Sequence, residues 1–118
     1  MSMREIKFRA WDGKRMITDG FLIRPWDGNI IAAVNILEYP LMQYTGLKDK
    51  NGNGIYEGDV LQLSEPVEVY WSETMASFYI RHPEILVDEP LEGYNKAAEI
   101  IGNVYENPDL LSAKTDEV

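Results

Sequence analysis

The amino-acid sequence predicts a small, mainly β domain, either a β-sandwich or an open barrel of short antiparallel strands with one or two short helices. Several short segments alternate between apolar and polar residues, as half-buried strands do. Asp-Gly and Asn-Gly pairs lie between these segments and favour tight turns. The 118 residues, of which 45% are hydrophobic, are enough for one domain with its own core.

The first half of the chain is expected to be a series of strands. Residues 4–11 alternate, with Ile6, Phe8 and Ala10 on one face and charged residues with Trp11 on the other. The elements that follow are, in chain order, a turn at Asp12-Gly13, a returning strand over 16–23, a turn at 26–29, an apolar segment over 30–37 whose β-branched residues favour a strand, and an extended segment over 41–46.

The second half begins with the strongest turn signal. Residues 48–54 contain an Asn-Gly pair, which accepts positive φ at little cost. The elements that follow are strands over 55–59 and 60–63, a hairpin of strands over 67–71 and 76–81, an acidic surface loop over 83–90 with a short strand at 85–87, a helical turn over 94–99, and a last strand over 100–105. Asn107 before Pro108 predicts a short C-terminal helix over 107–111.

Composition limits the possible functions. The net charge of −9 argues against nucleic-acid binding, which depends on Lys and Arg, although five basic residues lie within the first fifteen. The absence of cysteine excludes disulfides and Cys-ligated metals and fits the cytoplasm of a bacterial cell. No apolar stretch approaches the about 20 residues that span a bilayer, so no membrane partner is expected.

We expect one domain over residues 1–118. Residues 1–2 are either the natural start or a cloning remnant before Met3, and residues 113–118 are expected to form a flexible tail.

One loop partly matches a calcium-binding pattern. Oxygen ligands are wanted at loop positions 1, 3 and 5, glycine at 6 and a bidentate Glu at 12. Asp49 begins such a series, but Val60 occupies position 12 and no flanking helices are expected. We therefore interpret residues 48–54 as a polar hairpin loop. Glu57 and Asp59, two residues apart on one strand face, are the remaining candidate acid pair.

Other catalytic patterns are missing from the sequence. His82 is the single histidine, and its place before Pro83 at a strand end suggests an exposed structural residue. No Gly-x-Ser-x-Gly elbow, phosphate loop or dinucleotide fingerprint is present. The sequence thus predicts no catalytic residue, no metal and no cofactor, and favours a protein that is not an enzyme.

Aromatic residues are the better candidates for binding. Three Trp, seven Tyr and three Phe are many for a small domain, and most are expected to fill the core. Those beside turns or charged strand faces could instead anchor a partner. With the polar residues around the 48–54 loop, the candidate binding residues are Trp11, Tyr44, Lys48, Asp49, Tyr56, Glu57 and Asp59.

Four stretches, residues 3–12, 41–52, 55–60 and 101–111, together resemble the YopX family, small proteins found mainly in phages and prophages of Gram-positive bacteria. The segments 67–82 and 83–97 look individual to this chain. The resemblance implies a β-rich fold and a phage context, and it supplies no activity or catalytic residues. Tyr56-Glu57-Gly58-Asp59 before a strand also resembles the entry to a strand of an SH3-like barrel, which is an analogy of fold alone.

Three functional hypotheses remain. The first is a phage or prophage accessory protein that binds a host or phage protein without catalysis. The second is a metal-dependent hydrolase that uses acidic residues around 49–59. The third is a nucleic-acid binder or an acidic mimic of DNA. Because short strands leave edges that proteins often pair, a homo-oligomer is a further hypothesis.

Overall fold

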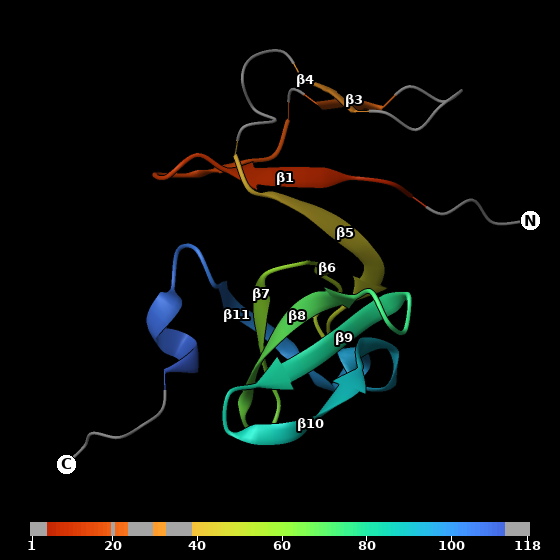
Figure 1. Ribbon diagram of the computed structural model, residues 1–118, viewed down its shortest axis with the longest axis vertical. Helices are drawn as coiled ribbons and strands as arrows, with labels where there is room; N and C mark the ends of the chain where they lie inside the picture. Colours follow the sequence, from red (N-terminus) through yellow and green to blue (C-terminus); the bar gives the residue numbers. More distant parts are fainter. Residues whose placement is uncertain (1–4, 20, 24–29, 33–38, 113–118) are drawn as a thin grey trace, which may run out of the picture.

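The computed structural model describes residues 5–19, 21–23, 30–32 and 39–112 (Figure 1). It is mainly β, which confirms the predicted fold class. A four-stranded antiparallel sheet, a five-stranded antiparallel sheet that curls into a half-barrel, and a separate strand pair make up the molecule. Its described helices are short 3-10 turns. None of these helices is long and apolar enough to cross a membrane.

The four-stranded sheet has the order β2 (Met16–Ile17), β1 (Phe8–Trp11), β5 (Leu41–Lys48), β6 (Gly54–Tyr56). The predicted turn at Asp12-Gly13 joins β1 to β2. The Asp12 carboxylate accepts hydrogen bonds from the backbone N–H groups of Lys14 and Arg15, and Gly13 has a φ of 100°. Figure 1 shows β5 descending from the level of β1 toward the half-barrel, so this long strand connects the two sheets.

The returning strand predicted over residues 16–23 is divided. β2 pairs with β1, but β3 (Phe21–Ile23) pairs with β4 (Ile30–Ala32) instead. The register Ala10↔Ile17 means that β1, which begins at Phe8, has no residues left to pair with positions 21–23. The turn predicted at 26–29 and the part of the predicted 30–37 strand beyond β4 lie outside the described residues.

The half-barrel has the order β10 (Ile85–Pro90), β9 (Ser77–His82), β8 (Pro66–Ser72), β7 (Asp59–Gln62), β11 (Glu99–Asn103). The predicted β8–β9 hairpin is confirmed, with Val69 opposite Ile80. The strand predicted at 85–87 within a loop is longer: β10 continues to Pro90, which lies opposite Tyr79. Proline is tolerated there because β10 is the edge strand of the sheet.

The core fills the concave side of the half-barrel. Leu61 and Ile55 are fully buried, and Leu91 from η2 (Leu91–Gly93) covers them. The complete cluster is Ile55, Leu61, Val67, Val69, Phe78, Ile80, Leu91 and Ala98. Alternate residues of β8 and β9 supply its wall, as the period-two pattern predicts.

Two further 3-10 turns flank β11. η3 (Asn95–Ala97) confirms the helical turn predicted over 94–99, and η4 (Pro108–Leu111) confirms the C-terminal helix. Asn107 does not cap η4 through its side chain. Its Oδ1 instead accepts the backbone N–H of Asn103 at 3.2 Å, so Asn107 closes the turn after β11. Residues 113–118, predicted as a tail, lie outside the described residues.

Candidate functional site

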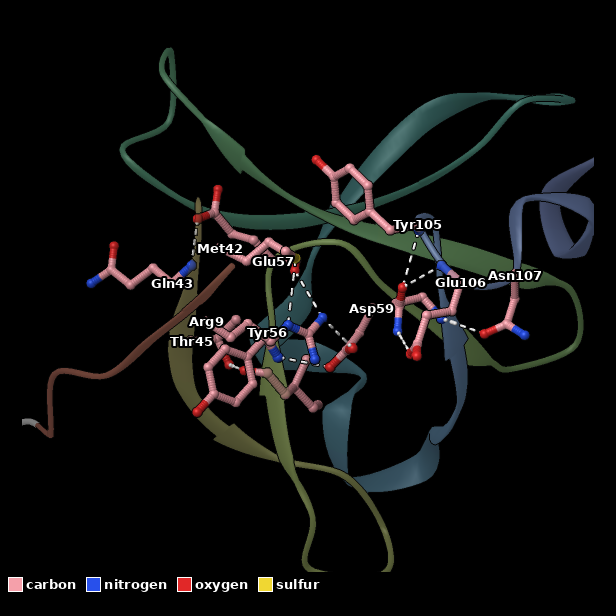
Figure 2. Close-up of polar contacts among 12 residues, drawn as sticks. Arg9, Met42, Gln43, Thr45, Tyr56, Glu57, Asp59, Tyr105, Glu106 and Asn107 are labelled. Carbon is pink, nitrogen blue, oxygen red and sulfur yellow. Dashed lines mark hydrogen bonds and ion pairs between the residues drawn. The ribbon is translucent and has the colours of Figure 1, made fainter. Parts of the chain in front are cut away.

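A buried ion pair joins the two sheets at the start of β7 (Figure 2). Arg9 of β1 places Nη2 2.7 Å from Oδ1 of Asp59, and the two side chains are only 11% and 3% exposed. The same Nη2 donates to the Glu57 carbonyl at 3.2 Å, and the guanidinium lies 4.7 Å from the centre of the Tyr56 ring. Asp59 Oδ2 accepts the Tyr56 N–H at 2.8 Å. We call Arg9, Tyr56, Glu57 and Asp59 the sheet junction.

The two carboxyl groups of the junction are desolvated. Burial raises the pKa of Asp59, and the charge of Arg9 and the Tyr56 N–H only partly offset this effect. Burial also raises the pKa of Glu57, whose Oε1 accepts the backbone N–H of Gln43 at 2.8 Å. Both carboxylates therefore accept hydrogen bonds from other parts of the protein and support the fold.

Asp49 closes the loop between β5 and β6. Its Oδ1 accepts the N–H groups of Asn51 and Asn53, both at 2.9 Å, and its Oδ2 accepts the N–H of Ile100 in β11 at 3.0 Å. Burial alone would raise the pKa of Asp49, but these three backbone donors lower it. Asp49 therefore ties the loop to the half-barrel. This agrees with the polar-loop interpretation of residues 48–54.

The neighbours of Asp49 strengthen this connection. Lys48 has an exposed side chain, while its carbonyl accepts Nδ2 of buried Asn95 at 2.7 Å. The backbone N–H of Lys50 donates to the Ala98 carbonyl at 2.9 Å. Residues 48–50 are thus fastened to the segment around η3. We call these contacts, with those of Asp49, the loop clamp.

The aromatic candidates are largely packed within the protein. Tyr44 is 5% exposed and lies 5.4 Å from Tyr56 between ring centroids, with the Lys7 ammonium 4.5 Å from its ring. Trp11 stacks on Tyr105 at 6.2 Å and is half-buried. These rings connect β1 and β5 with β6 and with the turn after β11. A binding role for Trp11, Tyr44 and Tyr56 stays a prediction.

The structure thus divides the predicted site residues into two groups. Tyr56, Glu57 and Asp59 meet at the sheet junction, and Lys48 with Asp49 lies at the loop clamp near the other end of β5. Sequence analysis missed Arg9 as the partner of Asp59. No local signal pointed to this pairing, because the period-two pattern placed Arg9 on the charged face of its strand with Glu5 and Lys7.

An apolar hollow lies elsewhere, at the open edge of the half-barrel. Its volume is about 250 Å³, and apolar side chains form most of its lining. The lining residues are Leu63, Ser64, Glu65, Val67, Ile80, Arg81, His82, Ile85, Val87, Glu89 and Tyr94. We call this feature the β10 hollow, because β10 forms its outer wall. Alternation of Ile85, Val87 and Glu89 was the sequence signal that could have found it.

His82 lies at one end of the β10 hollow and was predicted to be exposed. Its side chain is instead only 8% exposed. Nδ1 accepts the backbone N–H of Glu84 at 2.9 Å, and Nε2 lies 3.7 Å from Oε1 of Glu65. The period-two pattern of β9 explains the burial, because His82 shares a face with the core residues Phe78 and Ile80.

Metal ligands do not gather in the described residues. Within those ranges, no group of three or more His, Cys, Asp or Glu side chains is placed to hold a metal ion. The carboxylates of Asp49 and Asp59 are instead occupied by backbone N–H groups and by Arg9.

Comparison with known proteins decides the family. The family model described as YopX protein matches residues 23–112. The chain belongs to the YopX family. Comparison with curated proteins gave no match.

Two solved structures have the same fold. Protein EF1440 from Enterococcus faecalis is 28% identical, with a TM-score of 0.60, and the match covers 93% of this chain and all of that one. Protein yopX from Bacillus subtilis is 23% identical, with a TM-score of 0.58, over 91% of this chain and 96% of that one. The second likeness shows the fold alone.

The four stretches that resemble the YopX family can be located in the fold. Residues 41–52 form β5 and the loop clamp, and residues 55–60 contain most of the sheet junction. Residues 101–111 form the end of β11, its closing turn and η4. The stretch at 3–12, which supplies Arg9, lies outside the matched range 23–112. The β10 hollow lies outside the four stretches but within the matched range 23–112.

Proposed function

We propose that this YopX-family chain is a phage-derived accessory protein that binds another protein, of the host or of the phage, in the host cytoplasm and without catalysis. The binding surface in this proposal is the β10 hollow with the edge strand β10. The observation that carries it is an apolar hollow flanked by exposed apolar side chains at a strand edge.

Exposure supports this choice of surface. Val87 is 67% exposed and Ile85 is 46% exposed, although both lie in a strand beside a largely apolar hollow. Tyr94, across the hollow, is 38% exposed. Single exposed apolar residues are ordinary, but neighbouring ones around a hollow are typical of interaction sites.

The size of the hollow favours side chains of a partner over a cofactor. At about 250 Å³ it is smaller than the sites of drug-sized ligands, which are about 300–1,000 Å³. Buried anchors in small pockets carry much of the energy of protein interfaces. The hollow is therefore suited to the side chain of a partner protein.

Three of the five basic residues near the N-terminus lie beside carboxylates, which weakens them as a patch for nucleic acid. Arg9 is buried against Asp59, Lys7 lies 3.7 Å from Glu5, and Arg15 lies 3.9 Å from Asp12. These carboxylates would reduce the attraction to phosphates. This arrangement supports a protein partner over a nucleic acid.

Substitution at the hollow tests the proposal. Immobilised wild-type protein and Val87→Ser are compared for proteins captured from a host lysate, with Met75→Ser as the matched control. Met75 is 56% exposed but lies in the β8–β9 turn, outside the hollow. Changes at such exposed positions alter stability by within about 0.5 kcal/mol, so all three proteins should fold.

The expected result is a captured protein that is lost with Val87→Ser and kept with Met75→Ser. Equal capture by all three proteins, or loss with both variants, would contradict a binding role for the hollow.

A further inference from the structure

We infer that the partner supplies an extended, basic segment that adds to β10 as a sixth strand of the half-barrel and places an apolar side chain in the β10 hollow. This inference rests on the proposed function and specifies the chemistry of the partner.

The edge of the half-barrel is open to an added strand. Within the described residues, β10 pairs with β9 on one side, with a shift of register between Ile85 and Glu89, and with no strand on the other. Its six residues span about 20 Å, at roughly 3.3 Å per residue. Unpaired backbone groups on such an edge are a template for an extended peptide. Figure 1 shows β10 as the outermost strand at the end of the molecule farthest from β3 and β4.

The side chains along β10 match this mode of binding. Ile85, Val87 and Glu89 all line the hollow, which is the alternation that one face of a strand requires. An added strand has the same period and would present every second side chain to the same face. An apolar residue at such a position would reach the hollow, whose lining includes the core residues Val67 and Ile80.

Charge selects a basic partner. Residues 83–95 contain four acidic residues and no Lys or Arg: Glu84, Asp88, Glu89 and Glu92. Tyr70 Oη donates to Asp88. The other three make no ion pair with any described residue. The cationic side chain of Arg81, which lines the hollow, already has partners within the protein. It pairs with Glu68 at 3.3 Å and stacks 4.1 Å from the Tyr70 ring.

The same charges argue against a second copy of this chain at β10. Antiparallel pairing of two β10 strands would bring four carboxylates along one shared edge, Asp88 and Glu89 of each copy, with Glu84 and Glu92 close to its ends. Like charges opposite one another destabilise strand pairing. A segment with Lys or Arg at the positions flanking its apolar residues would instead neutralise Glu84, Glu89 and Glu92.

Synthetic peptides test the inference. The probes are end-capped peptides of about eight residues. The first alternates Lys and Val, the second alternates Glu and Val, and the third is the Lys/Val peptide with proline at its two central positions. Binding to the full chain is measured by backbone amide NMR titration, which also locates the contacts.

We expect the Lys/Val peptide to shift amide signals of β10 and the hollow, and to bind more weakly as salt rises above about 0.15 M. The Glu/Val peptide should not bind, and proline should weaken binding at least about tenfold because it removes backbone donors. The double variant Glu89→Lys/Glu92→Lys should lose a similar factor. The matched control Glu73→Lys, in the exposed β8–β9 turn, should leave affinity within about twofold.

Three results would overturn the inference. They are no binding of the Lys/Val peptide at millimolar concentration, equal binding of the proline peptide, and equal loss with Glu73→Lys. A dimer of wild-type chain that Val87→Ser dissociates would identify a second copy as the occupant. Lysate capture that depends on Val87 without peptide binding would retain the proposed function and reject only this partner chemistry.

Discussion

Replacing Arg9 with methionine should strongly destabilise the fold. Asp59 would keep a side chain that is 3% exposed but lose its cationic partner at 2.7 Å. Removing one member of a buried ion pair costs about 3–5 kcal/mol, whereas an exposed pair contributes about 0–1 kcal/mol. Because small domains unfold at a cost of about 5–15 kcal/mol, Arg9→Met should remove roughly a fifth of the stability or more.

The loss should depend on pH in a defined direction. Without Arg9, the pKa of the buried Asp59 carboxyl rises further, so the folded variant favours the protonated form. Such a group contributes stability that is fully present below its unfolded pKa, near 3.8, and lost as pH rises through the folded pKa. The gap between Arg9→Met and wild type should therefore be small in acid and widen toward neutral pH.

Urea unfolding followed by tryptophan fluorescence measures these free energies. The set is wild type, Arg9→Met, Asp59→Asn and the double variant, which together isolate the coupling energy. The double variant should be more stable than Arg9→Met alone near pH 7, because it no longer buries an unpaired charge. The matched control is the exposed pair Lys50–Glu99, 3.6 Å apart and about half exposed on both sides, whose coupling should stay below about 1 kcal/mol.

Two outcomes would refute this reasoning. One is a coupling for Arg9–Asp59 no larger than that for Lys50–Glu99. The other is an Arg9→Met penalty that grows toward acid pH, which would mean that Asp59 is not the group left unpaired.

Three other predictions concern stability. Glu57→Gln keeps a hydrogen-bond acceptor but removes a carboxyl group whose pKa is raised by burial, so it should stabilise the fold near pH 7. In unfolding titrations, this gain in stability should vanish below about pH 4.5. Asp49→Ala leaves three backbone N–H donors unpaired and should lower the free energy of unfolding by roughly 1–3 kcal/mol or more. Because the pKa of Asp49 is lowered in the folded protein, this penalty should shrink as pH falls below about 3.8. Gly102→Ala would place Cβ 2.8 Å from Leu110 Cδ1 and should cost about 1–3 kcal/mol in thermal or urea unfolding, while Gly93→Ala, which meets no atom within 4 Å, should be nearly neutral.

Local patterns were enough to predict most of the strands. Period-two alternation located β1, β8 and β9, and the Asn51-Gly52 pair located the loop before β6, where Gly52 has a φ of 85°. These features depend on neighbouring residues alone, so the sequence carries them directly. The division of the predicted 16–23 strand was missed because it depends on where the partner strand β1 begins.

The contacts that hold the site regions together were not predictable in this way. Arg9 and Asp59 are separated by 50 positions, and Asp49 reaches Ile100 across 51. No local pattern specifies which distant group a buried charge will meet. The β10 hollow has the same origin, since its lining comes from the β7–β8 connection, from β8, β9 and β10, and from Tyr94.

The placement of the YopX-like stretches limits what family membership can say about function. Three buried polar residues lie in these stretches, and their side chains contact other parts of the protein. Asp49 accepts backbone N–H groups, Asp59 pairs with Arg9, and Asn103 closes the turn after β11. These contacts specify a scaffold. The exposed apolar and acidic residues of β10 lie outside the four stretches but inside the range 23–112 that the family model matches, and none of the contacts just described involves them. If recognition resides at β10, substitutions of its exposed residues should alter binding without altering stability.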